Sequence, residues 1–151
     1  RRKADALLSA RWVPLPAFAV LLTCLIFGCS EQNGPILYDV SGKATRNGQP
    51  VTNLRIHFAP EQGRESTAIL DSAGGFVIQY GRNRDGALPG KHLVWCERPP
   101  KSPQEELDMQ SGKFVMPPEI QAILDKYGSA EVTPLSVDIA IDGQSVELKF
   151  D

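Results

Sequence analysis

Apolar and polar residues alternate with a period of two along much of this chain. The alternation is clearest in four segments, residues 54–58, 76–80, 137–141 and 146–150. A period of two places successive side chains on opposite faces of a strand, so each segment is expected to bury one face and expose the other. Less regular apolar stretches predict further strands at 38–45, 66–70 and 91–97. Seven short strands, most of them with no helix between, predict an all-β antiparallel sandwich rather than a parallel sheet.

Turn residues separate the predicted strands. Asn47-Gly48 follows the first strand, and Asp142-Gly143 is expected to join the last two as a tight hairpin. Residues 71–75 link two more strands, and the Asp71 carboxylate is expected to cap its own turn. These turns predict the architecture of the domain and not an activity.

Residues 98–134 interrupt this pattern with a polar, proline-rich insert. Within it, apolar residues recur at helical spacing after Pro117-Pro118, which predicts one short amphipathic helix over about 118–127. A helix of about three turns needs a surface to pack on. Leu93 and Trp95 fall on the outer face of their strand, so the helix is expected to cover them. The alternative is that Trp95 is exposed and the helix packs at an end of the sandwich.

The N-terminal region has the pattern of a secretory signal. Four basic residues precede an uncharged run at 12–27, which is shorter than a bilayer span and is expected to be helical. The run ends in Ile26-Phe27-Gly28-Cys29, which resembles the lipobox of bacterial lipoproteins. The resemblance implies a signal peptide over 1–28 and a diacylglycerol attached to the thiol of Cys29. The alternative is an uncleaved single-pass anchor.

Cleavage before Cys29 changes the charge and the cysteine count. Residues 1–28 hold four of the 16 Lys and Arg and one of the 18 Asp and Glu, which leaves a formal net charge of −5. Such a surface offers no electrostatic footprint for nucleic acid. With Cys24 removed and Cys29 lipidated, Cys96 is the remaining thiol, and it is expected on the core face as an inert small hydrophobe.

Three motifs occur in the order and spacing of one known family. They are V-S-G-K-A followed by N-G-Q-P-V within 40–51, D-S-A-G-G-F at 71–76, and D-G-A-L-P-G-K-H-L-V at 85–94. The chain thereby resembles the carboxypeptidase-regulatory-like domain family, whose members have a transthyretin-like Greek-key sandwich. The last motif, the insert and K-Y-G at 126–128 are most similar to short lipoproteins of planctomycete-type bacteria. Residues 30–36 are polar and contain Gly34 and Pro35, which predicts a tether at 29–36. The resemblance implies a sandwich domain at 37–151 and a structural or binding role.

Candidate chemistry in the sequence is sparse. His57 and His92 are the only histidines, and neither has the companion ligands that a metal site requires. We find no nucleophile motif and no convergent acid–base set, so no catalytic, metal-binding or cofactor-binding residue is predicted. The interpretation is a non-enzymatic lipoprotein of the cell envelope, facing the periplasm or the cell surface. Its expected partners are the membrane, through the lipid, and an envelope protein or glycan.

Two alternative functions remain open at this stage. A carbohydrate-binding module would use an exposed aromatic side chain, for which Trp95, Tyr80 and Tyr127 are the candidates. An accessory subunit of an envelope enzyme or transport complex would instead present a large apolar patch to its partner.

Overall fold

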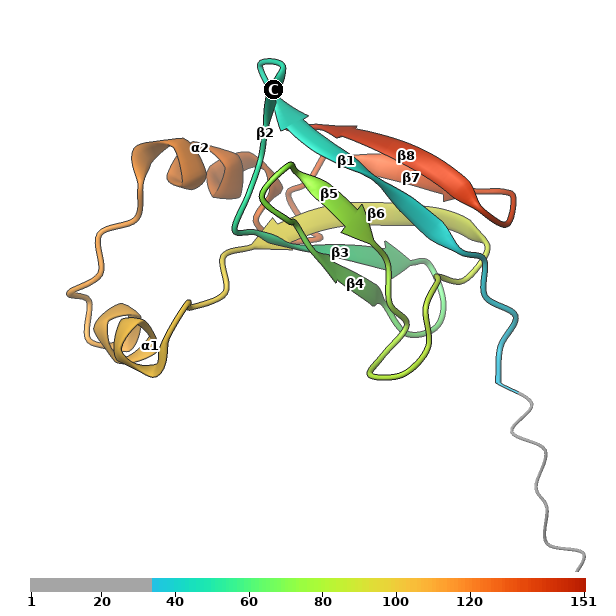
Figure 1. The fold of residues 1–151 in the computed structure, drawn as a ribbon, viewed down its shortest axis with the longest axis horizontal. Coiled ribbons are helices and arrows are strands. Elements are labelled where there is room, and N and C mark those ends of the chain that lie inside the picture. The colour runs from blue at the N-terminus through green and yellow to red at the C-terminus, as the bar shows by residue number, and fades with distance from the viewer. Residues whose placement is uncertain (1–33) are drawn as a thin grey trace, which may run out of the picture. The chain divides into compact units, whose positions relative to one another are not determined.

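Eight strands and two short helices follow one another in the computed structural model, which describes residues 34–151 (Figure 1). The strands are β1 (Val40–Arg46), β2 (Gln49–Pro50), β3 (Arg55–Pro60), β4 (Ser66–Ile69), β5 (Gly75–Val77), β6 (Gly90–Glu97), β7 (Ser136–Ile139) and β8 (Gln144–Lys149). The helices are α1 (Pro103–Gln110) and α2 (Pro118–Tyr127). The predicted signal peptide at 1–28 and the lipidation site at Cys29 lie outside the described residues.

The strands form two four-stranded sheets. In one sheet β1 is central, with β8 parallel to it on one edge and with β2 and β5 antiparallel to it on the other. The other sheet is antiparallel throughout, in the order β4-β3-β6-β7. The predominantly β structure is therefore confirmed, while the parallel β1–β8 pair differs from the all-antiparallel prediction. The extra strand relative to the predicted seven is β2, which pairs with β1 across the Asn47-Gly48 turn.

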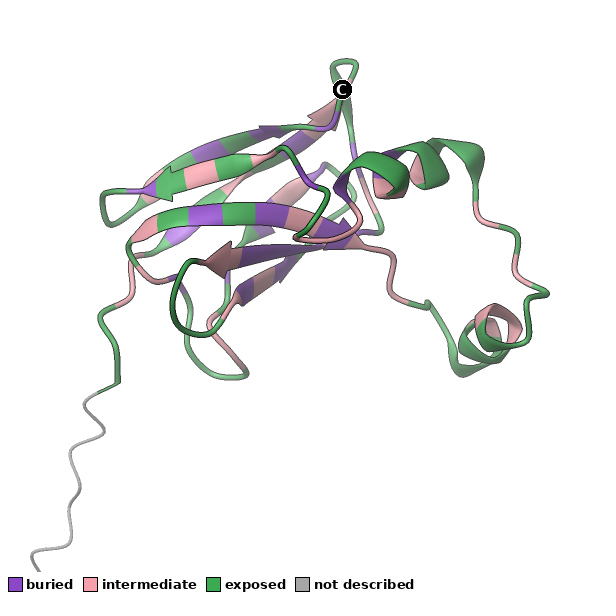
Figure 2. Ribbon diagram, turned by 180° about the vertical axis from the view of Figure 1, so that it is seen from behind, coloured by how far each residue is buried: buried purple, intermediate pink, exposed green. Residues whose placement is uncertain are grey.

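One apolar core joins the two sheets. Every strand except β2, whose two residues are exposed, contributes its inward-facing residues, as the period of two predicts. The largest fully buried side chains are those of Phe58, Phe150, Leu54, Ile56, Ile78, Ile139 and Leu148. Figure 2 shows buried residues alternating with exposed ones along the strands.

The Asp142-Gly143 turn does not make the predicted hairpin. β7 and β8 belong to different sheets, so this turn carries the chain across the sandwich. The Asp142 carboxylate accepts a hydrogen bond from the backbone N–H of Asp39 at 2.7 Å, which fixes the turn beside the start of β1. β8 then pairs with β1 over six residues and turns Val146 and Leu148 into the core. Alternation alone does not determine whether β8 pairs with β7 or with β1.

The Asp71 turn forms as predicted. Asp71 Oδ1 accepts hydrogen bonds from the backbone N–H groups of Ala73, at 2.7 Å, and Gly75, at 2.8 Å. Gly74 within this turn has a φ of 73°, and its backbone lies so close to Ala44 O that a Cβ would be 2.6 Å from that oxygen. Glycine is required there both by conformation and by space.

The insert contains two helices where the sequence predicted one. The bounds of α2 agree with the prediction, and its buried residues are Ile123 and Tyr127. α1 was not predicted, because it has no apolar stripe and buries none of its residues. Within residues 34–151, neither helix is long and apolar enough to cross a bilayer.

The prediction that α2 covers Leu93 and Trp95 is wrong. α2 lies at one end of the sandwich, where Tyr127 packs edge-on against Phe150 with ring centroids 5.1 Å apart (Figure 1). Leu93 is 40% exposed, and the Trp95 ring stacks on His57 instead. The apolar stripe of α2 extends the core at its open end, which the alternative stated above had allowed.

Candidate functional site

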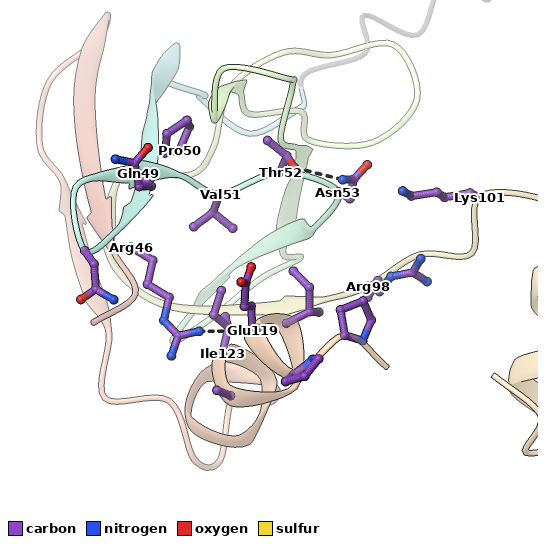
Figure 3. A pocket seen from close by; sticks show the side chains of 15 residues that line it. Arg46, Gln49, Pro50, Val51, Thr52, Asn53, Arg98, Lys101, Glu119 and Ile123 are labelled. Carbon is purple, nitrogen blue, oxygen red and sulfur yellow. Dashed lines mark hydrogen bonds between the residues drawn. The ribbon is translucent and has the colours of Figure 1, made fainter. Parts of the chain in front are cut away.

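A cavity of about 730 Å³ opens at the end of the sandwich beside α2 (Figure 3). We call it the end pocket. Three separate parts of the chain form its walls: residues 46–53, the segment that follows β6, and the first half of α2. Its lining residues are Arg46, Asn47, Gln49, Pro50, Val51, Thr52, Asn53, Arg98, Lys101, Pro117, Pro118, Glu119, Ile120, Ala122 and Ile123.

The β1–β2 hairpin forms the first wall. Asn47 and Gly48 have φ values of 49° and 77°, the left-handed conformations that a two-residue hairpin turn requires. Arg46 precedes the turn and Gln49 follows it, and both side chains line the pocket. The Arg46 guanidinium donates a hydrogen bond to the backbone carbonyl of Glu119 at 2.6 Å, which joins the hairpin to α2 (Figure 3).

α2 forms the second wall and is held there by its C-terminal half. Pro118 occupies the first turn, where the missing N–H costs no helical hydrogen bond. Ile123 is 3% exposed and enters the core beneath the pocket. The Tyr127 hydroxyl donates a hydrogen bond to the backbone carbonyl of Asp151 at 2.8 Å, so the end of the chain also fixes the helix.

The third wall begins where β6 ends. The Arg98 side chain is 6% exposed, pairs with the Glu105 carboxylate, and lies over the Phe114 ring at 4.6 Å from its centroid. The Lys101 backbone N–H also donates to Glu105, and this hydrogen bond, followed by the one from Arg98, lowers the pKa of that carboxyl group. These contacts attach α1 to the body of the domain. They also place Lys101 on the opposite side of the pocket from Arg46 (Figure 3).

The pocket lining is polar and cationic above an apolar base. The amide side chains of Asn47, Gln49 and Asn53 are exposed at its rim. Arg46, Arg98 and Lys101 face a single acidic lining residue, Glu119. The described lining residues include no aromatic side chain. An arrangement of this kind binds a ligand through hydrogen bonds and charge, and it offers no ring for stacking.

A second group of side chains lies on the outer face of the β4-β3-β6-β7 sheet. We call it the outer-face cluster, and it consists of Arg55, His57, Glu65, Trp95 and Glu97. The His57 and Trp95 rings stack with centroids 3.8 Å apart and planes at 11°. His57 Nδ1 lies 3.1 Å from Glu65 Oε1 and its Nε2 lies 3.4 Å from Glu97 Oε1, which Arg55 also contacts at 2.7 Å. His57 is consequently buried, although it lies on the face that was expected to be wet.

The two histidines do not meet. His92 lies on the inward face of β6, is fully buried, and its Nε2 lies 2.8 Å from the backbone carbonyl of Leu88. Across residues 34–151, no group of three or more His, Cys, Asp or Glu side chains is arranged to hold a metal ion. Each histidine is thus part of the local packing of its own face.

Cys96 lies on the core face, as predicted. It is a free thiol with 0% exposure, and burial raises its pKa from 9.0 to about 12. The thiol therefore stays protonated at neutral pH, and the protonated form is a poor nucleophile. This agrees with the predicted structural role.

The end pocket was not predicted from the sequence, and Trp95 and His57 of the outer-face cluster were considered only as separate candidates. The end pocket draws on three segments that are separated by about 45 and 16 residues, and the one motif among them, N-G-Q-P-V at 47–51, predicted a turn and not a binding site. The outer-face cluster depends on the pairing of His57 with Trp95 in adjacent strands. One usable signal was present in the sequence. The strand at 91–97 has apolar residues on both faces, with Trp95 on the outer one.

Comparison with known proteins adds no relative to this description. No protein-family model, curated protein or solved structure matches the chain.

Proposed function

We propose that this protein is a non-enzymatic lipoprotein of the bacterial envelope that presents a β-sandwich domain to a partner. In this proposal Cys29 carries the lipid, residues 29–36 form the tether, and the domain faces the periplasm or the cell surface. The membrane is then one partner, reached through the acyl chains, and an envelope protein is the other.

The position of the end pocket carries the proposal. The tether enters the domain at Pro35, whose carbonyl accepts a hydrogen bond from Arg84 at 2.8 Å, and Tyr38 then pairs with Ala87. From there β1 runs to Arg46 in the pocket wall, a distance of about 20 Å at roughly 3.3 Å per residue. A domain anchored through Pro35 therefore holds the end pocket away from the anchor.

The Greek-key arrangement and the family assignment are part of the same proposal. The chain passes between the two sheets at β2–β3, β4–β5, β5–β6 and β7–β8, and β8 returns beside β1. Repeated crossing of this kind supports a Greek-key sandwich that resembles the carboxypeptidase-regulatory-like domains. In this structure the β1–β2 hairpin, the segment after β6 and α2 of the insert gather at one end of the sandwich. Loops gathered at an end of a sandwich domain are a common place for a binding site.

A carbohydrate-binding role is the second candidate, and a specific observation favours it. Trp95 is part-exposed on an open sheet face, with the polar groups of Arg55 and Glu97 beside it. An aromatic ring flanked by planar hydrogen-bonding groups is suited to a sugar ring. However, one face of the Trp95 ring is already covered by His57.

Two measurements test the proposal. Mass spectrometry of the membrane-extracted protein should find an acylated cysteine at position 29 as the mature N-terminus. Affinity purification of the detergent-solubilised protein should retain an envelope component, and retention should survive the Trp95→Ala substitution. An intact chain before Cys29 would overturn the lipoprotein assignment, while loss of retention in Trp95→Ala would favour the carbohydrate-binding alternative.

A further inference from the structure

We propose that the end pocket binds an acidic, extended peptide segment of the partner protein. This inference rests on the proposed function, because it names the chemistry of the partner and the residues that recognise it. Three properties of the pocket support it: its charge, its amide rim and its rigid apolar base.

The charge of the pocket is opposite to that of the rest of the domain. Arg98 is neutralised by Glu105, which leaves Arg46 and Lys101 against Glu119 among the lining residues. Within the described part of the chain, neither Arg46 nor Lys101 forms an ion pair with a carboxylate. A local excess of positive charge on a domain of formal net charge −4 (residues 37–151) selects an acidic ligand and speeds its encounter.

The rim of the pocket matches a peptide backbone. Each of the exposed amides of Asn47, Gln49 and Asn53 carries both a donor and an acceptor, as a peptide group does. Such side chains can therefore pair with an extended backbone, whichever of its groups faces them. Asn47 and Gln49 precede the connection between β2 and β3, and Asn53 lies within it.

The base of the pocket is apolar, since Val51 and Ile123 are buried lining residues. The exposed Pro50, Pro117 and Pro118 and the part-buried Ile120 add rigid apolar surface to the lining. Proline rings present apolar surface without losing side-chain freedom when a ligand binds. A base of this kind suits the aliphatic side chains of a peptide, whereas a saccharide site would be expected to provide an aromatic ring.

The test measures binding of defined probes to the full-length protein in mild detergent. The probes are a fluorescein-labelled decapeptide of alternating glutamate and valine, the matching lysine–valine peptide, and oligogalacturonate as an acidic saccharide. Fluorescence anisotropy should show binding of the glutamate–valine peptide that weakens with added salt, and the lysine–valine peptide should not bind. In competition, oligogalacturonate should not displace the bound peptide.

Charge substitutions in the pocket should change the affinity in opposite directions. Arg46→Gln and Lys101→Gln should each weaken peptide binding about two- to fivefold, as expected for exposed charges. Glu119→Gln should strengthen it, because it removes the one acidic lining side chain. Lys91→Gln is the matched control: Lys91 is exposed near the start of β6, outside the pocket, and its removal should leave the affinity unchanged.

The outcomes separate this inference from the proposed function. Unchanged affinity in all three pocket variants, weaker binding in Glu119→Gln, or displacement by oligogalacturonate would overturn the peptide assignment. If the peptide affinity is unchanged in the pocket variants while the detergent-solubilised protein still retains an envelope component, the proposed function stands and this inference fails. If Cys29 is not acylated but peptide binding is salt-sensitive and changes in the pocket variants, the lipoprotein assignment fails and the peptide assignment stands.

Discussion

The two helices of the insert have similar lengths but are attached to the domain in different ways. α2 buries Ile123 and Tyr127 and completes the core at its open end. α1 contains no buried residue (Figure 2). It is held by the contacts of Glu105 with Arg98 and Lys101. A short helix is marginal by itself, so it needs tertiary support. Here that support comes from apolar packing in one helix and from one charged cluster in the other.

The largest effect is expected from a truncation in α2. Ile123→Ala should destabilise the whole domain by about 2–5 kcal/mol, the range for a buried aliphatic side chain. The free energy of unfolding in urea, followed by circular dichroism, measures this. A loss below about 1 kcal/mol would mean that α2 is not part of the core.

The rate at which the Cys96 thiol is alkylated should depend on the packing of α2 and not on that of α1. Cys96 borders a small cavity that Leu124 and Gly128 of the α2 region also line. Alkylation of the Cys96-containing peptide by iodoacetamide, followed by mass spectrometry, should be negligible in the folded protein and faster in Ile123→Ala. Glu105→Gln should leave the rate unchanged. Equal acceleration by both substitutions would show that the helices open together.

The same thiol contributes to stability in a pH-dependent way. Burial raises its pKa in the folded state from the ordinary value of 9.0 to about 12, so between these values the folded state retains a proton that the unfolded state loses. The stabilisation is therefore fully present below pH 9 and is lost as the pH rises towards 12. The free energy of unfolding should fall less steeply over this interval in Cys96→Ala.

Acid should loosen α1 before it affects α2. The pKa of Glu105 is lowered by the hydrogen bonds from Lys101 and Arg98, so their stabilisation is present above pH 4.5 and is lost as the pH falls through the folded value. The Lys101 amide proton should shift below pH 4.5 in NMR spectra. In Glu105→Gln this titration should be absent, with the α2 resonances unchanged. A simultaneous shift of α2 resonances would contradict the separation of the two helices.

The smallest effect is expected from an apolar residue of α1. Leu107 is 58% exposed, so Leu107→Ala should change the free energy of unfolding by no more than about 0.5 kcal/mol. It serves as the control for Ile123→Ala, since both remove an aliphatic side chain from a helix of the insert. A loss comparable to that of Ile123→Ala would show that α1 also packs on the domain.

The sequence alone determined the local elements of this protein. Alternation located four of the strands and less regular apolar stretches located three more, the Asp71 carboxylate marked its turn, and the apolar stripe with Pro118 fixed the bounds of α2. These features depend on neighbours within a few residues, so a single chain displays them. α1 was missed because its stability comes from Arg98 and Lys101, outside the helix, and leaves no periodic signal within it.

Only the tertiary structure decided which elements meet. Alternation shows that a strand has a core face but not which strand it pairs with, so the parallel β1–β8 pairing and the crossing at Asp142-Gly143 were not predictable. The same holds for the position of α2, because its stripe fits either a sheet face or the end of the sandwich. The end pocket depends on that choice, since Arg46, Lys101 and Glu119 come together only when the insert folds back against the β1–β2 hairpin.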